Sequence, residues 1–143
     1  MKHTRYLIIF LIWYLSASCV STPLPNKITI TPPSSDIPKE LAAFSGGWKG
    51  IFFGGFEVTL IVQTIKKENV HLIYSWGENM AGPGGYYRVL ANVISGPGVE
   101  WVNKDNYRFT FVMNDDLESL TGILYNPKEK RNYEAKLKRY KLR

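Results

Sequence analysis

The sequence predicts an all-β domain: an antiparallel up-and-down meander of about eight short strands that closes into a small barrel, preceded by a short helical turn. Between residues 48 and 140, apolar and polar side chains alternate with a period of two, which is typical of half-buried strands. Turn residues interrupt this alternation roughly every 12 residues, a spacing that indicates a sandwich or a barrel. The short connections favour pairing of sequential strands, and closure into a barrel removes exposed strand edges.

The helical turn is expected at residues 38–44. Pro38 suits a first helical turn, Ser35 or Asp36 can cap it, and two glycines follow its end. The strands that follow are expected at residues 48–53, 56–65, 70–76, 86–94, 99–103, 107–113, 117–125 and 133–139. A glycine-rich loop at residues 77–85 is expected at one mouth of the barrel.

The N-terminal residues 1–18 have the pattern of a secretory signal peptide. Lys2 and Arg5 make a basic start, residues 6–15 are apolar or aromatic, and small side chains follow at residues 16–18. The apolar run is too short for an ordinary membrane-spanning helix. Export with cleavage is therefore the first interpretation, and an uncleaved membrane anchor or a buried N-terminal helix is the alternative.

Cys19 directly follows this segment and is the one cysteine of the chain. The run Leu15-Ser16-Ala17-Ser18-Cys19 resembles the lipobox of bacterial lipoproteins. That resemblance implies that the Cys19 thiol takes a diacylglyceryl group and becomes the mature N-terminus. Val20 and Ser21 follow it without an aspartate, which by the same resemblance implies sorting to the outer membrane, facing the periplasm. The alternative is ordinary signal cleavage that leaves a free cysteine.

Residues 19–37 are expected to form a tether, anchored by that lipid, between the membrane and the domain at residues 38–143. Five of the eight prolines precede residue 39, and all twelve glycines follow residue 45. Proline removes backbone donors and favours extended geometry, so this change in composition marks the boundary of the domain.

The start of the domain resembles the lipocalin-type (calycin) barrels. Gly47-Trp48-Lys49-Gly50 follows the helical turn, much as the Gly-x-Trp signature of that family opens its first strand. The family also has an arginine at the end of its last strand that lies over the tryptophan. By this resemblance Trp48 and Arg139 would form the base of the barrel, where a cation over an indole ring stabilises by about 0.5–2 kcal/mol.

The same resemblance implies that a small apolar ligand binds inside the barrel. An eight-stranded barrel is just filled by its own side chains or holds one small molecule. The large residues expected to line the interior are Tyr74, Trp76, Trp101, Phe109 and Phe111. Two interpretations remain open here: these rings line a ligand cavity, or they fill the interior completely.

Catalytic and metal-binding patterns are weak. His71 is the one histidine after residue 18, so a site built from several histidines is excluded from the mature chain, and we expect no catalytic residue, no metal and no cofactor. Glu57, Glu78 and Glu100 are isolated carboxylates. A small envelope hydrolase or isomerase using carboxylates at the barrel mouth is the alternative function, and clustering of these side chains in one cleft would favour it.

Positive charge is concentrated at the C-terminus. The formal net charge is +6, and residues 128–143 alone carry eight basic and two acidic side chains. An exported protein seldom meets nucleic acid, so anionic lipid headgroups are the better-suited partner for this last strand, and a solvated basic strand is the alternative. Together these patterns favour an exported, lipid-anchored envelope protein without catalytic activity, whose barrel binds a small apolar ligand or docks an envelope partner.

Overall fold

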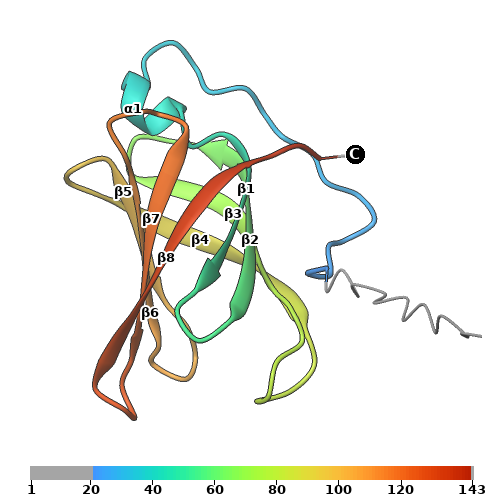
Figure 1. Cartoon of the computed structure of the whole chain (residues 1–143). Helices are drawn as coiled ribbons and strands as arrows, with labels where there is room; N and C mark the ends of the chain where they lie inside the picture. Colours follow the sequence, from blue (N-terminus) through green and yellow to red (C-terminus); the bar gives the residue numbers. More distant parts are fainter. Residues whose placement is uncertain (1–20, 143) are drawn as a thin grey trace, which may run out of the picture.

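The computed structural model describes residues 21–142 and confirms the expected all-β barrel. Eight antiparallel strands run in sequence order, and the last pairs with the first to close the sheet (Figure 1). They are β1 (Gly46–Phe52), β2 (Phe56–Ile65), β3 (Asn69–Trp76), β4 (Gly85–Ile94), β5 (Gly98–Val102), β6 (Arg108–Met113), β7 (Ser119–Asn126) and β8 (Arg131–Tyr140). Helix α1 (Lys39–Ala42) precedes β1, so the order of elements agrees with the prediction.

Several element boundaries differ from the expectation by one or two residues; β1, for example, begins at Gly46 and β8 at Arg131. Helix α1 is shorter than residues 38–44, and no side chain caps it. Asp36 instead accepts a hydrogen bond from Ser34 and pairs with Lys67. Strand β7 begins two residues later than expected because Leu117 adopts a left-handed backbone conformation, with φ of 55°, and belongs to the turn.

The two ends of the barrel are built differently. At the end where β1 begins, which we call the closed end, helix α1 covers the interior (Figure 1). Ile37, Leu41 and Phe44 from this segment join the same buried cluster as Trp48. At the opposite end, which we call the open end, short turns and the loop at residues 77–84 connect the strands and no helix lies across the opening.

The barrel wall is incomplete between β4 and β5. Strand β4 pairs with β3 from Gly85 to Asn92, but with β5 only at Asn92, Val93 and Ile94. Strand β5 has 5 residues against 10 in β4, and its hairpin with β6 turns at residues 103–107 through backbone and Asn103 side-chain hydrogen bonds. Residues 85–91 of β4 therefore have no partner strand on the β5 side within the described chain, and the wall is open there.

The N-terminal segment lies against the outside of β2 and β3. Residues 21–37 form no helix or strand and are held along the barrel. The Thr22 and Thr59 hydroxyl groups share a hydrogen bond of 2.6 Å, Ser75 donates to the Pro23 carbonyl, and Thr31 donates its N–H to the Gln63 carbonyl. Residues 19 and 20 of the predicted tether lie outside the described residues.

This segment explains why one outer face of the barrel is buried. Ile61 and Ile73 face away from the interior, stand opposite each other across β2 and β3, and are both fully buried. They lie between the positions at which residues 22–31 are hydrogen-bonded to the sheet. We call residues 21–31 the strap. Among residues 21–142, no helix has the length and apolarity that crossing a bilayer requires.

Candidate functional site

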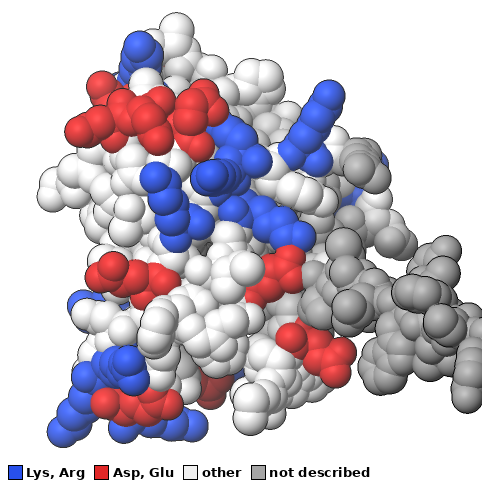
Figure 2. Space-filling view, viewed as in Figure 1, with Lys and Arg blue, Asp and Glu red and all other residues white. Residues whose placement is uncertain are grey.

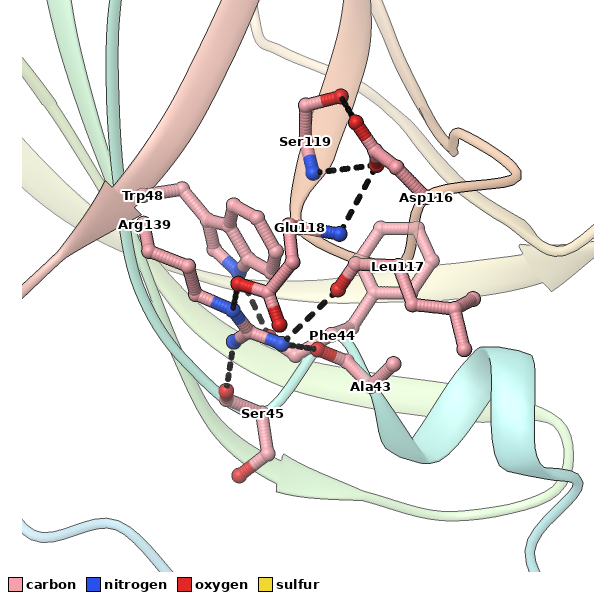
Figure 3. A network of polar contacts seen from close by, with 9 residues as sticks. All are labelled: Ala43, Phe44, Ser45, Trp48, Asp116, Leu117, Glu118, Ser119 and Arg139. Carbon is pink, nitrogen blue, oxygen red and sulfur yellow. Dashed lines mark hydrogen bonds and ion pairs between the residues drawn. The ribbon is translucent and has the colours of Figure 1, made fainter.

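The closed end is built around Trp48. Its ring is fully buried, and its indole N–H donates to the Phe44 carbonyl at 2.7 Å. The Arg139 guanidinium lies 3.9 Å from the centre of this ring (Figure 3). Trp48 and Arg139 are directly opposite each other in the β1–β8 pairing, so the register of the closing strands places them together. The structure thus brings together the two residues that the sequence proposed as the base.

Arg139 also links two other chain segments to β8 at this end. It donates to the carbonyl groups of Ala43 and Ser45, which end the helical segment, and to that of Leu117 in the β6–β7 turn (Figure 3). A looser ion pair of 3.5 Å joins it to Glu118. Because a guanidinium offers five donors in a fixed plane, one side chain can satisfy carbonyl groups that the short helix leaves without partners.

The β6–β7 turn is held from within by Asp116. Its carboxylate accepts the backbone N–H groups of Glu118 and Ser119 and the Ser119 hydroxyl. These hydrogen bonds, the one to the Glu118 N–H first among them, lower the pKa of Asp116 below its usual value. This arrangement is turn chemistry, and it positions the Leu117 carbonyl that Arg139 reaches (Figure 3).

Toward the open end, aromatic rings replace aliphatic side chains inside the barrel. Tyr74 is central: its ring centre lies 4.8 Å from that of Phe109, 5.5 Å from Tyr87, 5.6 Å from Trp101 and 6.2 Å from Trp76. Trp101 stacks on Phe109 with an interplanar angle of 6°. Such contacts are worth about 0.5–1.5 kcal/mol each beyond the area that they bury.

These rings border a cavity of about 860 Å³ at the open end. Its walls combine inward-facing aromatic and aliphatic side chains with residues along the open edge of β4 and the β5–β6 turn. The lining consists of Phe52, Phe56, Glu57, Tyr74, Trp76, Asn79, Tyr86, Tyr87, Arg88, Val89, Leu90, Trp101, Val102, Asn103, Lys104, Asp105, Phe109 and Leu124. The cavity thus reaches the surface through the gap in the wall between β4 and β5.

The cavity offers a few polar groups. The Trp101 indole N–H donates to the Tyr87 hydroxyl at 3.2 Å and so bridges the gap from inside. No hydrogen bond within residues 21–142 uses the Tyr74 hydroxyl, although this side chain is only 6% exposed and borders the cavity. Burial raises the pKa of both Tyr74 and Tyr87, which keeps the two hydroxyl groups protonated as hydrogen-bond donors.

Trp76 stands at the rim of this cavity. Its indole N–H donates to the Pro83 carbonyl at 3.2 Å, which attaches the glycine-rich loop to the barrel. Gly85 lies beside it across β3 and β4, and a side chain there would place a Cβ only 2.6 Å from the Trp76 ring. The absence of a side chain at Gly85 therefore lets the indole lie flat along the wall.

Four of the five interior aromatic residues proposed from the sequence border the cavity: Tyr74, Trp76, Trp101 and Phe109. Phe111 does not border it. This ring is fully buried nearer the closed end, in edge contact with Phe52 and stacked near Trp101. The interior is thus filled by side chains near the closed end and open to a small molecule at the other.

The sequence analysis did not propose Phe56, Tyr87, Val89 or Leu124, which also border the cavity. A signal for two of them was present. In β4, Tyr87, Val89, Ala91 and Val93 alternate with exposed or polar neighbours and belong to the interior cluster or pack against it. The gap between β4 and β5 left no comparable pattern in the sequence, because it depends on the length of the neighbouring hairpin.

The candidate catalytic side chains do not come together in one cleft. Of Glu57, Glu78, Glu100 and His71, only Glu57 borders the cavity, and it is paired with Lys49 at 2.5 Å. Glu100 accepts a hydrogen bond from Thr110, and His71 is exposed on the outer face of β3. Within residues 21–142, no three His, Cys, Asp or Glu side chains are arranged to hold a metal ion.

Comparisons with known proteins bear on the fold. No protein-family model matches the chain, and no curated protein matches it. Among solved structures, the barrel is similar to a chain from the de novo design of a fluorescence-activating β-barrel, with a TM-score of 0.54 and 17% sequence identity. That match covers 73% of this chain and 100% of the designed one. At this identity the likeness concerns the barrel fold alone.

Proposed function

We propose that this chain is an exported lipoprotein of the bacterial envelope whose barrel binds one small, mostly apolar molecule in the cavity at its open end. A single observation carries the binding proposal: one barrel is packed solid at one end and hollow at the other. Natural ligand sites are concave, mostly apolar and supplied with a few polar groups, and their volumes run from about 300 to 1,000 Å³. The cavity at the open end has these properties.

The polar groups narrow the class of ligand. Rings and aliphatic side chains make up most of the interior lining, so the buried part of the ligand is apolar. The Tyr74 hydroxyl is a protonated donor without a protein partner among the described residues; because no fully buried polar side-chain atom there lacks a hydrogen bond, this hydroxyl faces the open space of the cavity. A ligand that carries one hydrogen-bond acceptor among apolar atoms would accept a hydrogen bond from this hydroxyl. A designed barrel of similar fold is described as fluorescence-activating, which supports the proposal that this barrel holds a small molecule.

Export and lipid anchoring rest on the sequence of residues 1–19. The strap adds a geometric consequence. Thr22 is fixed to Thr59 on β2, and only two residues separate it from Cys19. An extended chain spans about 3.5 Å per residue, so a lipid on Cys19 would hold the barrel within about 10 Å of the membrane surface. Anchored in this way, the domain would lie on the membrane.

Tryptophan fluorescence tests the ligand proposal, because Trp76 and Trp101 border the cavity. Titration with a panel of fatty acids and other small apolar molecules should give a saturable change for at least one of them. Trp76→Ala should weaken that binding tenfold or more without unfolding the barrel, since aromatic contact area would be lost at the rim. Tyr74→Phe removes one hydroxyl, keeps the ring, and should weaken only ligands that have an acceptor.

The matched control is Tyr125→Phe. Tyr125 neighbours Leu124 on β7, but its side chain is 36% exposed on the outer face and does not border the cavity. This change should leave binding as it is. No saturable change across the panel, or equal effects of Tyr74→Phe and Tyr125→Phe, would contradict the proposal.

Lipid anchoring has its own test. The intact mass of the mature protein should correspond to a chain that begins at Cys19 and carries acyl groups, and Cys19→Ala should leave a larger precursor. A mature chain that begins elsewhere, or a Cys19 thiol free of lipid, would contradict the anchor and leave the ligand proposal standing.

A further inference from the structure

We propose that the outer face of β1 and β8 docks on an anionic lipid surface, so that the barrel lies on its side with the gap between β4 and β5 turned away from the membrane. This inference builds on the proposed envelope location and adds a defined orientation. It concerns a surface on the opposite side of the barrel from the open edge of the cavity.

The face carries a row of lysines. Lys49 on β1 stands directly opposite Lys138 on β8, and Ile51 stands directly opposite Lys136. Figure 2 shows Lys and Arg side chains gathered over this part of the molecule. The outward-facing basic side chains of β1 and β8 are Lys49, Lys136 and Lys138, and the acidic ones beside them are Glu57 on β2 and Glu134 on β8. The face therefore has an excess of positive charge.

Most of this charge is not neutralised within the protein. Lys49 pairs with Glu57, and Lys136 helps to lower the pKa of Asp116 in the β6–β7 turn, but no ion pair within residues 21–142 involves Lys136 or Lys138. Like charges that stand directly opposite each other across two strands destabilise a sheet. Glu57 offsets the charge of Lys49, whereas Lys138 and Lys136 keep charges that an anionic partner over this face would offset.

Apolar side chains project from the same face. Ile51 is 61% exposed and Phe53 is 70% exposed, although both are large and apolar. Both point outward from β1 or its end, and Arg131 lies over the Phe53 ring at 6.0 Å. Basic side chains beside exposed apolar ones are the composition that binds an anionic bilayer surface: the charges meet the headgroups, and the apolar groups enter the interface.

The strap leaves the barrel next to this face. Thr22 is hydrogen-bonded to Thr59 on β2, and Thr59 is directly opposite Lys49 on β1. A lipid on Cys19, three residues before Thr22, would therefore reach the membrane on the side where the lysines lie. The anchor and the face would meet the same surface.

The strand order then determines which side of the barrel faces away from the membrane. In a closed barrel of eight sequential strands, the β8–β1 junction and the β4–β5 junction are separated by four strands in each direction. Docking through β1 and β8 therefore presents the gap, and with it the cavity, to the aqueous compartment. The ligand would be exchanged with that compartment, and the membrane would not block the gap.

The test is a lysine footprint on the full mature chain. The protein is mixed with, or anchored in, vesicles of phosphatidylcholine alone or of phosphatidylcholine with phosphatidylglycerol, and its lysines are acylated with a soluble reagent. Labelling of Lys136 and Lys138 should fall at least threefold in the anionic vesicles. Added salt should restore it, because salt screens exposed charges beyond about 10 Å at 0.1 M. Lys66 and Lys128, exposed elsewhere on the barrel, serve as internal controls.

Two double variants test whether Lys136 and Lys138 themselves bind the anionic surface. Each basic residue near such a surface contributes about 1 kcal/mol, so Lys136→Gln with Lys138→Gln should weaken binding to the anionic vesicles roughly thirtyfold and lower the protection of Lys49 accordingly. The matched control, Lys66→Gln with Lys128→Gln, removes the same charge from other surfaces and should change nothing. Equal labelling of Lys136 and Lys138 in both vesicles, or equal protection of the control lysines, would overturn the proposal. Neither outcome depends on ligand binding, which the fluorescence titration measures separately.

Discussion

The closed end and the open end of this barrel differ in how completely side chains fill the interior. At the closed end, a buried indole, a guanidinium over it and the carbonyl groups of two further segments satisfy one another. At the open end, aromatic rings border a cavity of about 860 Å³, the Tyr74 hydroxyl makes no hydrogen bond to another described residue, and residues 85–91 of β4 have no partner strand on the β5 side. The comparison teaches that stability is concentrated at one end, which leaves the other free to bind.

Replacing Trp48 should have the largest effect on stability. Trp48→Ala removes a fully buried ring and should lower the free energy of unfolding by about 3–5 kcal/mol, as for other large core truncations. Trp76→Ala, at the half-buried rim, should cost clearly less. Urea denaturation of the two variants measures both changes. Equal losses would show that the two ends contribute alike.

Replacing Arg139 should have an intermediate effect. Arg139→Ala removes the cation over Trp48 and hydrogen bonds to backbone carbonyls, and should cost about 1–3 kcal/mol because the guanidinium is partly exposed. A double-mutant cycle with Trp48→Phe should give a coupling energy of about 0.5–2 kcal/mol. Additive effects would mean that the contact over the ring contributes nothing of its own.

Stability at alkaline pH should depend on Tyr74 at the open end, and this effect should be smaller than the effects of replacing Trp48 or Arg139. Burial raises the pKa of Tyr74, so the folded state keeps its proton where an unfolded tyrosine, with a pKa of about 10, loses it. The stability due to this burial is fully present below about pH 10 and falls as pH rises above it. Tyr74→Phe should make the decline above pH 10 shallower, whereas the exposed Tyr86→Phe should not. Identical pH profiles would place the Tyr74 hydroxyl in a more hydrated setting.

Alternation in the sequence predicted the barrel well because each strand has one face in the core. The second strand, residues 56–65, is observed with the expected bounds, and the fourth differs by a single residue. Trp48 and Arg139 were paired through a resemblance, and the register of β1 and β8 places them in contact.

The strap, the gap beside β4 and the extent of the cavity depend on features that the alternation of apolar and polar residues does not encode. The strap was expected only as a tether, although Ile61 and Ile73 interrupt the polar outer faces of their strands and were a sign that something covers them. The gap beside β4 follows from where the β5–β6 hairpin turns, and the extent of the cavity follows from that gap. Phe111 shares a face with Phe109, but its depth in the barrel excludes it from the cavity.

Methyl NMR of the protein during a ligand titration tests most directly whether the open end alone binds. Val89 and Leu124 border the cavity, whereas Leu120 and Leu137 are fully buried among the packed core residues outside it. A saturating apolar ligand should shift the methyl signals of Val89 and Leu124 and show contacts to them, and should leave those of Leu120 and Leu137 nearly unchanged. Shifts of similar size at all four residues, or none at any of them across the ligand panel, would contradict a barrel that is packed at one end and receptive at the other.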